Sequence, residues 1–211
     1  MENEVSKGFN QEESKGFFRQ ETIIAPFTQG GRLQVRIFRP WELKALLSAI
    51  PKKQNKTQFE FLFYTGMRYI EAQAVHERED LFDGEHIHLI PKLIKKPKCT
   101  IKDRYVKLSP VGRRVAEDYF KLEKGLPHWN TWRENLQRWA LKGKIDPSFM
   151  STKSTRKTWE SYLIFTYPQW RDAIFITMGH SEMTALKNYV NLPFSQVNKD
   201  NMRRFVAGWE P

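Results

Sequence analysis

The sequence predicts an α+β fold that is mostly helical and contains a small antiparallel β-hairpin. Apolar residues recur at helical spacing through most of the chain from about residue 39 onward. Over 85–90 and 103–109 the pattern changes to alternation with β-branched residues, which is typical of two paired strands. With 40% hydrophobic and 14% aromatic residues among 211, the chain can bury one sizeable core.

The expected helices have recognisable starts and ends. Pro40 stands at a helix start, and Gly66 follows a helix of mostly apolar residues. Ser109 precedes a proline and caps a helix that closes with Gly125. The helices are expected near residues 39–50, 57–65, 67–75, 109–125, 129–142, 152–166, 168–178, 182–190 and 195–208.

The chain divides into a short N-terminal arm and one domain. Residues 1–22 carry five glutamates against two lysines and one arginine, a balance of −2, so the remainder carries +13. We expect residues 1–36 to form a flexible arm and residues 37–211 to form a single domain that ends with the helix 195–208.

The formal charge of +11 favours a polyanionic partner, and nucleic acid is the first candidate. An anionic membrane surface is the rival, but no apolar run approaches the ~20 residues that span a bilayer, and the N-terminus does not resemble a signal peptide. We therefore expect an intracellular protein without a membrane partner. The single cysteine, Cys99, excludes an internal disulfide and a cysteine metal cluster.

The stretch "TGMRYIE" is the first candidate site. Arg68 follows the helix break at Gly66, where a guanidinium near a helix N-terminus favours an anion. Alternatively, Arg68 pairs with Glu71 three residues on, as many surface arginines do.

Two further stretches contain residue types suited to phosphate chemistry. In "KSTR", Lys153 and Arg156 share one helix face, which fits either an anion held between them or a solvated basic face. In "MGHSEMTALKNY", His180 follows a glycine and Tyr189 lies nine residues on. Neither stretch has metal-ligand spacing.

A basic loop joins the two expected strands. It is either a finger that contacts phosphates or a solubilising turn, and the sequence favours neither. Its cations are Lys92, Lys95, Lys96, Lys98, Lys102 and Arg104.

Taken in order, these stretches resemble the catalytic domain of the tyrosine recombinases, or phage-type integrases. "TGMRYIE" is similar to their first arginine box, "KSTR" to their His-x-x-Arg box, and "MGHSEMTALKNY" to their Gly-His-Ser box with its tyrosine nine residues later. The resemblance runs from about residue 37 to 195. It implies a helical catalytic domain of the DNA breaking-rejoining type.

The resemblance also implies a role for each residue. Tyr189 attacks a DNA phosphodiester and forms a 3′-phosphotyrosine, and His180 lies beside the same phosphate. Arg68 and Arg156 clamp the non-bridging oxygens, where charge develops in the transition state. Lys96 on the hairpin protonates the departing 5′-oxygen as general acid. The phosphotyrosine conserves the bond energy, so no metal or other cofactor is expected.

Some assignments depart from the family or leave a choice. Lys153 stands in place of the usual histidine and is interpreted as a tolerated variant that donates to a non-bridging oxygen. Lys92 is the second candidate for the general acid. Glu71 is expected to support Arg68 rather than to react. Contacts with the DNA backbone are assigned to Lys92, Lys95, Lys98, Lys102 and Arg104.

The implied function is site-specific recombination, as in integration or excision of a mobile element or resolution of dimeric replicons, and topoisomerase-like relaxation is a lesser enzymatic variant. The implied partners are double-stranded recombination sites and further copies of the chain in a tetramer on DNA. The implied location is the cytoplasm of a cell or host cell, at the nucleoid. Family members usually begin with a DNA-clamping helical domain, for which fewer than forty residues are present here. The chain is thus expected to be a minimal recombinase, a fragment, or a protein that grips DNA by its loop and arm. A catalytically impaired DNA-binding relative that regulates recombination is the alternative.

Overall fold

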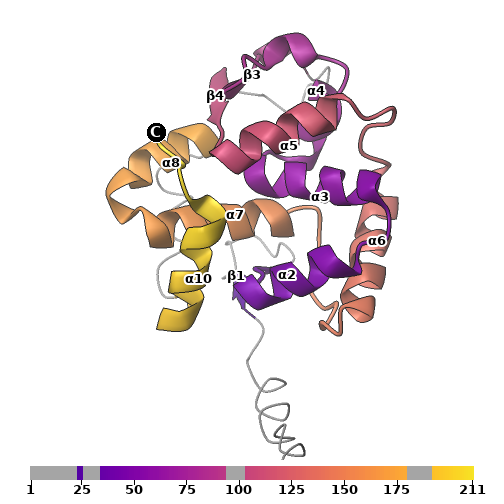
Figure 1. The fold of residues 1–211 in the computed structure, drawn as a ribbon, viewed down its shortest axis with the longest axis vertical. Coiled ribbons are helices and arrows are strands. Elements are labelled where there is room, and N and C mark those ends of the chain that lie inside the picture. Colours follow the sequence, from indigo (N-terminus) through magenta and orange to yellow (C-terminus); the bar gives the residue numbers. More distant parts are fainter. Residues whose placement is uncertain (1–22, 26–33, 94–102, 180–191) are drawn as a thin grey trace, which may run out of the picture.

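The computed structural model describes residues 23–25, 34–93, 103–179 and 192–211. This part of the chain is mostly helical and has small antiparallel sheets, which confirms the predicted α+β, mostly α class. Figure 1 shows the helices packed around α3, with the hairpin β3–β4 at one end and α10 toward the other. The helices are α2 (Pro40–Ala49), α3 (Lys53–Thr65), α4 (Tyr69–Val75), α5 (Pro110–Phe120), α6 (Trp129–Lys142), α7 (Ser154–Thr166), α8 (Arg171–Met178) and α10 (Gln196–Val206).

Local signals explain the helix boundaries. Ser109 Oγ accepts the N–H of Gly112 at 3.2 Å, as a capping serine should. Gly66 ends α3 in the left-handed conformation with φ of 59°, and its N–H donates to the carbonyl of Phe63. The helix expected over 109–125 ends earlier, at Phe120. The helix expected over 182–190 lies outside the described residues.

The core is formed where α3 lies between α5 and α7 (Figure 1). Phe61 of α3 stacks on Tyr119 of α5 with ring centroids 3.7 Å apart. On the other side of α3, Phe63 meets Trp159 of α7 edge-on at 5.3 Å. Alternate residues of one helix therefore anchor its two neighbours, which fixes the frame from which the site residues project.

The C-terminal helix α10 packs on α7 of the same chain. Met202 and Val206 are fully buried, and the indole N–H of Trp209 donates to the carbonyl of Lys107 in the hairpin at 3.1 Å. The end of the chain is thereby tied to the hairpin.

The predicted hairpin is present as β3 (His86–Leu89) and β4 (Arg104–Lys107), paired antiparallel. Ile87 and Leu89 face the core from β3, and Arg104 and Val106 face it from β4. An arginine therefore occupies an inward position of a strand whose other inward residue is apolar.

The expectation of a flexible arm over 1–36 is wrong for the residues described within that range. Strands β1 (Ile24–Ala25) and β2 (Val35–Arg36) pair antiparallel, and Ile23 is 1% exposed. The N–H of Arg36 donates to the carbonyl of Phe149 at 3.0 Å. Because Ile23 and Val35 are buried, the packed domain begins before residue 37.

Candidate anion site

The turn between α3 and α4 places the first arginine. Gly66 ends α3, and Arg68 stands at the N-cap of α4 two residues later. Glu71, in the first turn of α4, accepts the backbone N–H of Arg68 at 2.7 Å and its Nη1 at 2.7 Å. The side chain of Arg68 is 39% exposed, whereas that of Glu71 is 1% exposed. The carboxylate of the pair is therefore buried, whereas the guanidinium is accessible to solvent.

The second arginine comes from α7 and reaches the same turn. Arg156 is 6% exposed, and its Nη1 donates to the carbonyl of Gly66 at 2.6 Å. Its Nη2 donates to the carbonyl of Met178 at the end of α8. Burial lowers the pKa of Arg156 to about 10, partly offset by Glu160, so the guanidinium remains cationic at neutral pH.

The third arginine, Arg104, comes from the hairpin, and its position corrects the sequence-based assignment to the DNA-contacting loop. Its Nη2 donates to Glu71 at 2.8 Å, and its Nε donates to the carbonyl of Thr177 at 3.0 Å. With 3% of its side chain exposed, it does not reach a duplex on the surface. The physical reason is strand parity, because Arg104 shares the inward face of β4 with Val106.

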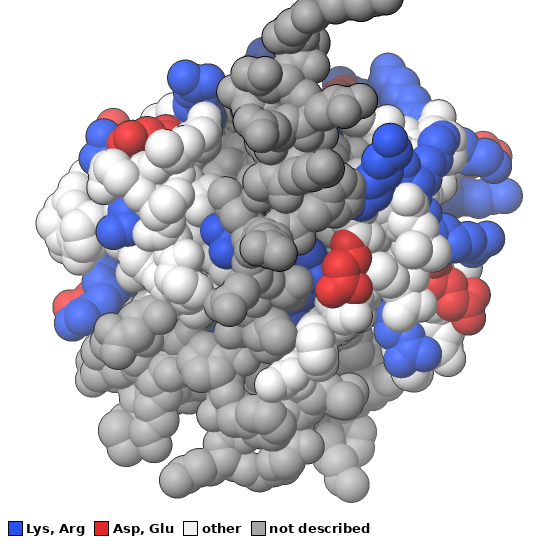
Figure 2. Space-filling view, turned by 90° about the horizontal axis from the view of Figure 1, so that it is seen from below, with Lys and Arg blue, Asp and Glu red and all other residues white. Residues whose placement is uncertain are grey.

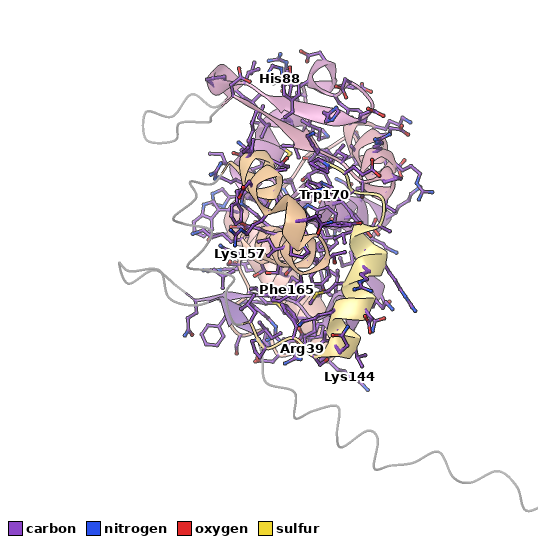
Figure 3. The ribbon with its side chains drawn as sticks, turned by 90° about the vertical axis from the view of Figure 1, so that its left-hand side faces the viewer. Arg39, His88, Lys144, Lys157, Phe165 and Trp170 are labelled. Atoms are coloured by element: carbon purple, nitrogen blue, oxygen red, sulfur yellow. The ribbon has the colours of Figure 1, made fainter. Side chains whose placement is uncertain are left out.

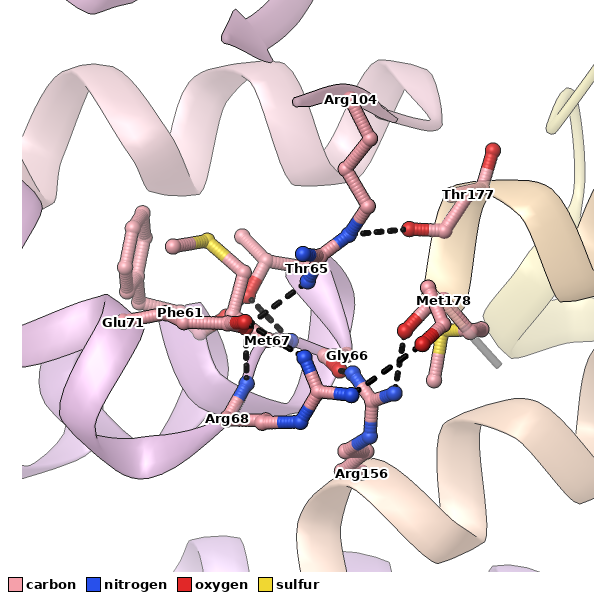
Figure 4. A network of polar contacts seen from close by, with 11 residues as sticks. Phe61, Thr65, Gly66, Met67, Arg68, Glu71, Arg104, Arg156, Thr177 and Met178 are labelled. Carbon is pink, nitrogen blue, oxygen red and sulfur yellow. Dashed lines mark hydrogen bonds and ion pairs between the residues drawn. The ribbon is translucent and has the colours of Figure 1, made fainter. Parts of the chain in front are cut away.

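The three guanidiniums meet at the C-terminal end of α8, as Figure 4 shows. Arg104 holds the carbonyl of Thr177, Arg156 that of Met178, and Arg68 that of Gly179 at 3.1 Å. The last carbonyls of a helix have no partner within the helix and carry partial negative charge. Three arginines from three separate elements thus converge on three consecutive carbonyls.

Gly179 is required at this point for two reasons. Its φ of 65° lies in the left-handed region, and it caps α8. A Cβ at this position would lie 3.0 Å from Nε of Arg104 and 3.1 Å from its Cδ. The glycine of the "MGH" motif therefore lets the arginine cluster close on the helix end.

Positive charge exceeds negative charge around this cluster. Burial alone raises the pKa of Glu71, but Arg104 and Arg68 together hold it below its ordinary value, so the carboxylate stays charged. On α7, burial lowers the pKa of Lys157, and the nearby charges of Arg156 and Lys153 lower it further. Among the described residues, four cations act on the carboxylates of Glu71 and Glu160. The cations are Arg68, Arg104, Arg156 and Lys157.

The remaining predicted residues are placed less completely. Lys153 is exposed at the N-cap of α7, and within the described part of the chain no hydrogen bond or ion pair joins it to the arginines. Lys92 lies in the short 3-10 helix Pro91–Leu93. Outside the described residues lie Lys95, Lys96, Lys98, Lys102, His180 and Tyr189. His180 directly follows Gly179 in the chain.

Exposed cations also lie away from the cluster. Figure 2 shows Lys and Arg side chains gathered toward the side of the molecule on which α6 lies in Figure 1. Exposed cations of α6 and the loop after it include Arg138, Lys142 and Lys144. Figure 3 places Lys144 at the opposite end of the molecule from His88 on the hairpin, with Lys157 between them. The basic character is thus spread over the body.

Over the described ranges, no group of three or more histidine, cysteine or acidic residues is arranged to hold a metal ion. No described helix is both long and apolar enough to cross a bilayer. Comparisons with protein-family models, with curated proteins and with solved structures found no match.

Proposed function

We propose that this chain is a site-specific DNA recombinase of the tyrosine class, which breaks and rejoins strands through a 3′-phosphotyrosine at Tyr189. The fold would then be a catalytic domain of the DNA breaking-rejoining type. Its substrates would be double-stranded recombination sites, bound by a tetramer in the cytoplasm of a cell or host cell.

One observation carries most of the proposal. Arg68 and Arg156, which come from the two arginine boxes, have their guanidiniums side by side at the end of α8 (Figure 4). The "GHS" stretch continues from that same helix end. The two arginine boxes, far apart in the chain, therefore meet at Met178 and Gly179, the residues that open the third motif.

The excess of positive charge supports a phosphate as the ligand. Guanidiniums bind phosphate oxygens in a bidentate manner, and a preorganised cluster stabilises charge that develops as phosphorus is attacked. Arg68 is the most exposed of the three arginines, at 39%, and so offers the first contact. Tyr189 would supply the nucleophile, His180 and Lys153 would donate to oxygens of the phosphate, and Lys96 would protonate the leaving 5′-oxygen.

A second candidate function has an observation in its favour. Both terminal nitrogens of Arg156 donate to backbone carbonyls in this structure, and Lys153, which replaces the usual histidine, is exposed. This arrangement suits a relative that binds DNA without cleaving it and regulates recombination by another protein. Binding with no covalent product would favour this candidate.

Trapping the covalent intermediate tests the proposal. The protein is incubated with duplexes that carry a nick in a central segment of random sequence. Cleavage close to the nick releases a short fragment, which diffuses away, so the strand cannot be rejoined and the covalent complex accumulates. A covalent adduct on a denaturing gel is expected for the wild type and not for Tyr189→Phe. An adduct that persists in Tyr189→Phe would overturn the assignment of the nucleophile, and DNA retention without any adduct would favour the second candidate.

A further inference from the structure

Arg104 contacts both Glu71, the partner of Arg68, and the C-terminal end of α8. Through Nη2 it shares the carboxylate of Glu71 with Arg68, at 2.8 Å for Arg104 and 2.7 Å for Arg68. Through Nε it holds the carbonyl of Thr177, two residues before Gly179. One side chain therefore links the most exposed arginine to the helix end from which the stretch containing His180 and Tyr189 continues.

The packing around Arg104 leaves it little freedom. Its side chain is 3% exposed, and that of Glu71 is 1% exposed. The close approach of Gly179 limits movement on another side, since even a methyl group there would lie about 3 Å from the guanidinium. A planar guanidinium that holds two separate partners in this way orients them more strictly than a point charge does.

Arg104 is too enclosed to touch a ligand at the exposed edge of Arg68. Any influence on a bound phosphate must pass through Glu71 and Arg68, or through the end of α8. Removing it would leave Glu71 with Arg68 as its remaining guanidinium partner in the described part of the chain and would free the carbonyl of Thr177. Glu71 and the C-terminal end of α8 would each lose a contact that holds them in place.

We infer that Arg104 is a positioning residue, which orients Arg68 through Glu71 and fixes the end of α8 ahead of His180 and Tyr189. The inference rests on the proposed function for its catalytic consequence. Arg104 is also the first residue of β4, at the exit of the basic loop. The arginine that orients Arg68 therefore belongs to the strand that directly follows the basic loop.

Substitution of Arg104 separates positioning from binding. Arg104→Gln is expected to slow adduct formation on the nicked DNA by on the order of 100-fold, the size of effect that slight misplacement produces. Affinity for the same DNA should remain close to that of the wild type, because exposed cations outside the cluster supply most of the attraction to the DNA backbone. Arg104→Lys should recover part of the rate, since it keeps a charge beside Glu71. The matched control is Arg78→Gln, which removes an exposed arginine paired with Asp80.

The pH profile adds a measurement that a general loss of stability would not change in the same way. Without Arg104, the pKa of Glu71 rises, so the rate for Arg104→Gln should decline at a higher pH than for the wild type as the solution is acidified. The wild-type and Arg78→Gln profiles should coincide.

Gly179→Ala tests the same contact from the opposite side. Gly179 and Gly84 both have positive φ, of 65° and 92°, but nothing lies within 4 Å of a Cβ at Gly84. Both alanine variants bear backbone strain, and only Gly179→Ala displaces Arg104. Adduct formation should fall in Gly179→Ala and be retained in Gly84→Ala.

If the wild type forms no adduct, that result counts against the proposed function alone. The role of Arg104 is then tested by a measurement that does not depend on catalysis. Inorganic phosphate at constant ionic strength should then raise the midpoint of thermal unfolding of the wild type. The shift should vanish in Arg68→Gln and shrink in Arg104→Gln. If Arg104→Gln matches Arg78→Gln both in adduct rate and in the phosphate shift, Arg104 is not a positioning residue.

Discussion

A second buried arginine–glutamate network, near the N-terminal strands, makes an instructive contrast with the arginine cluster at the end of α8. There, Arg36 of β2 pairs with Glu42 of α2 and with Asp146 at 3.4 Å. Glu42 also accepts the backbone N–H of Arg39 at 2.7 Å. The guanidinium of Arg36 thus meets two carboxylates, so negative charge is not in deficit there.

Among the residues that the structure describes, positive charge is in excess in the cluster at α8. Four cations there act on Glu71 and Glu160, and one of the arginines is 39% exposed. Burial of like charges is costly without a counter-ion. We propose that the first network holds elements together, whereas the second receives an anion.

Arg36→Met should break the first network. The loss of one partner leaves Glu42 buried without its guanidinium, which typically costs about 3–5 kcal/mol in the free energy of unfolding. Denaturant titration measures this cost. A loss comparable to that of the exposed-site variant Arg78→Gln would show that the network is not a structural clamp.

Arg68→Gln should have the opposite profile. We expect the barrier to adduct formation to rise by about 2.7–4 kcal/mol, the usual effect of losing one preorganised donor, with little change in stability. Single-turnover kinetics and thermal unfolding on the same preparation separate the two effects. A large loss of stability with an unchanged rate would make Arg68 a structural residue like Arg36.

Gly66→Ala should disturb the turn that presents Arg68. The left-handed conformation costs about 1–2 kcal/mol for a residue other than glycine. In addition, the new Cβ would lie 2.6 Å from Cδ1 of Trp159. The free energy of unfolding should therefore fall further than in Gly84→Ala, where the space is open. Equal losses in the two variants would mean that the turn tolerates the displacement.

Acid should weaken the cluster through Glu71. Its folded-state pKa lies below the ordinary value because Arg104 and Arg68 outweigh the effect of burial. A carboxyl of this kind contributes stability above its unfolded-state pKa, and the contribution disappears as the pH falls through the folded-state value. The decline in unfolding free energy below about pH 4.5 should therefore be shallower in Glu71→Gln than in the wild type. Parallel curves would contradict this.

The sequence predicts much of the fold because its signals are local. The proline at residue 40, the serine cap at residue 109 and the glycine at residue 66 each act within one turn of helix. The two strands of the hairpin follow from alternation. The missed strands β1 and β2 are two residues long, too short for a periodic pattern to reveal them.

The site was predictable only in part. The sequence offers either an anion or Glu71 as the partner of Arg68. Arg68 does pair with Glu71, but this carboxylate is buried and is shared with Arg104, unlike that of an ordinary surface pair. Arg104 was assigned to the basic loop because its charge resembles that of the neighbouring lysines. The alternation of the strand does indicate its true position, because Arg104 falls on the same face as the apolar Val106 and Leu108, and all three are buried. The partnership of Arg104 with Glu71 depends on the packing of distant elements, which no local pattern specifies.

We propose that the arginine cluster serves attack on a DNA phosphate by Tyr189. Mass spectrometry of the protease-digested covalent complex tests it most directly. We predict a single modified peptide, with a nucleotide joined through its 3′-phosphate to the hydroxyl of Tyr189. A nucleotide on any other residue, a linkage through a 5′-phosphate, or the absence of a modified peptide from DNA-bound protein would contradict the account.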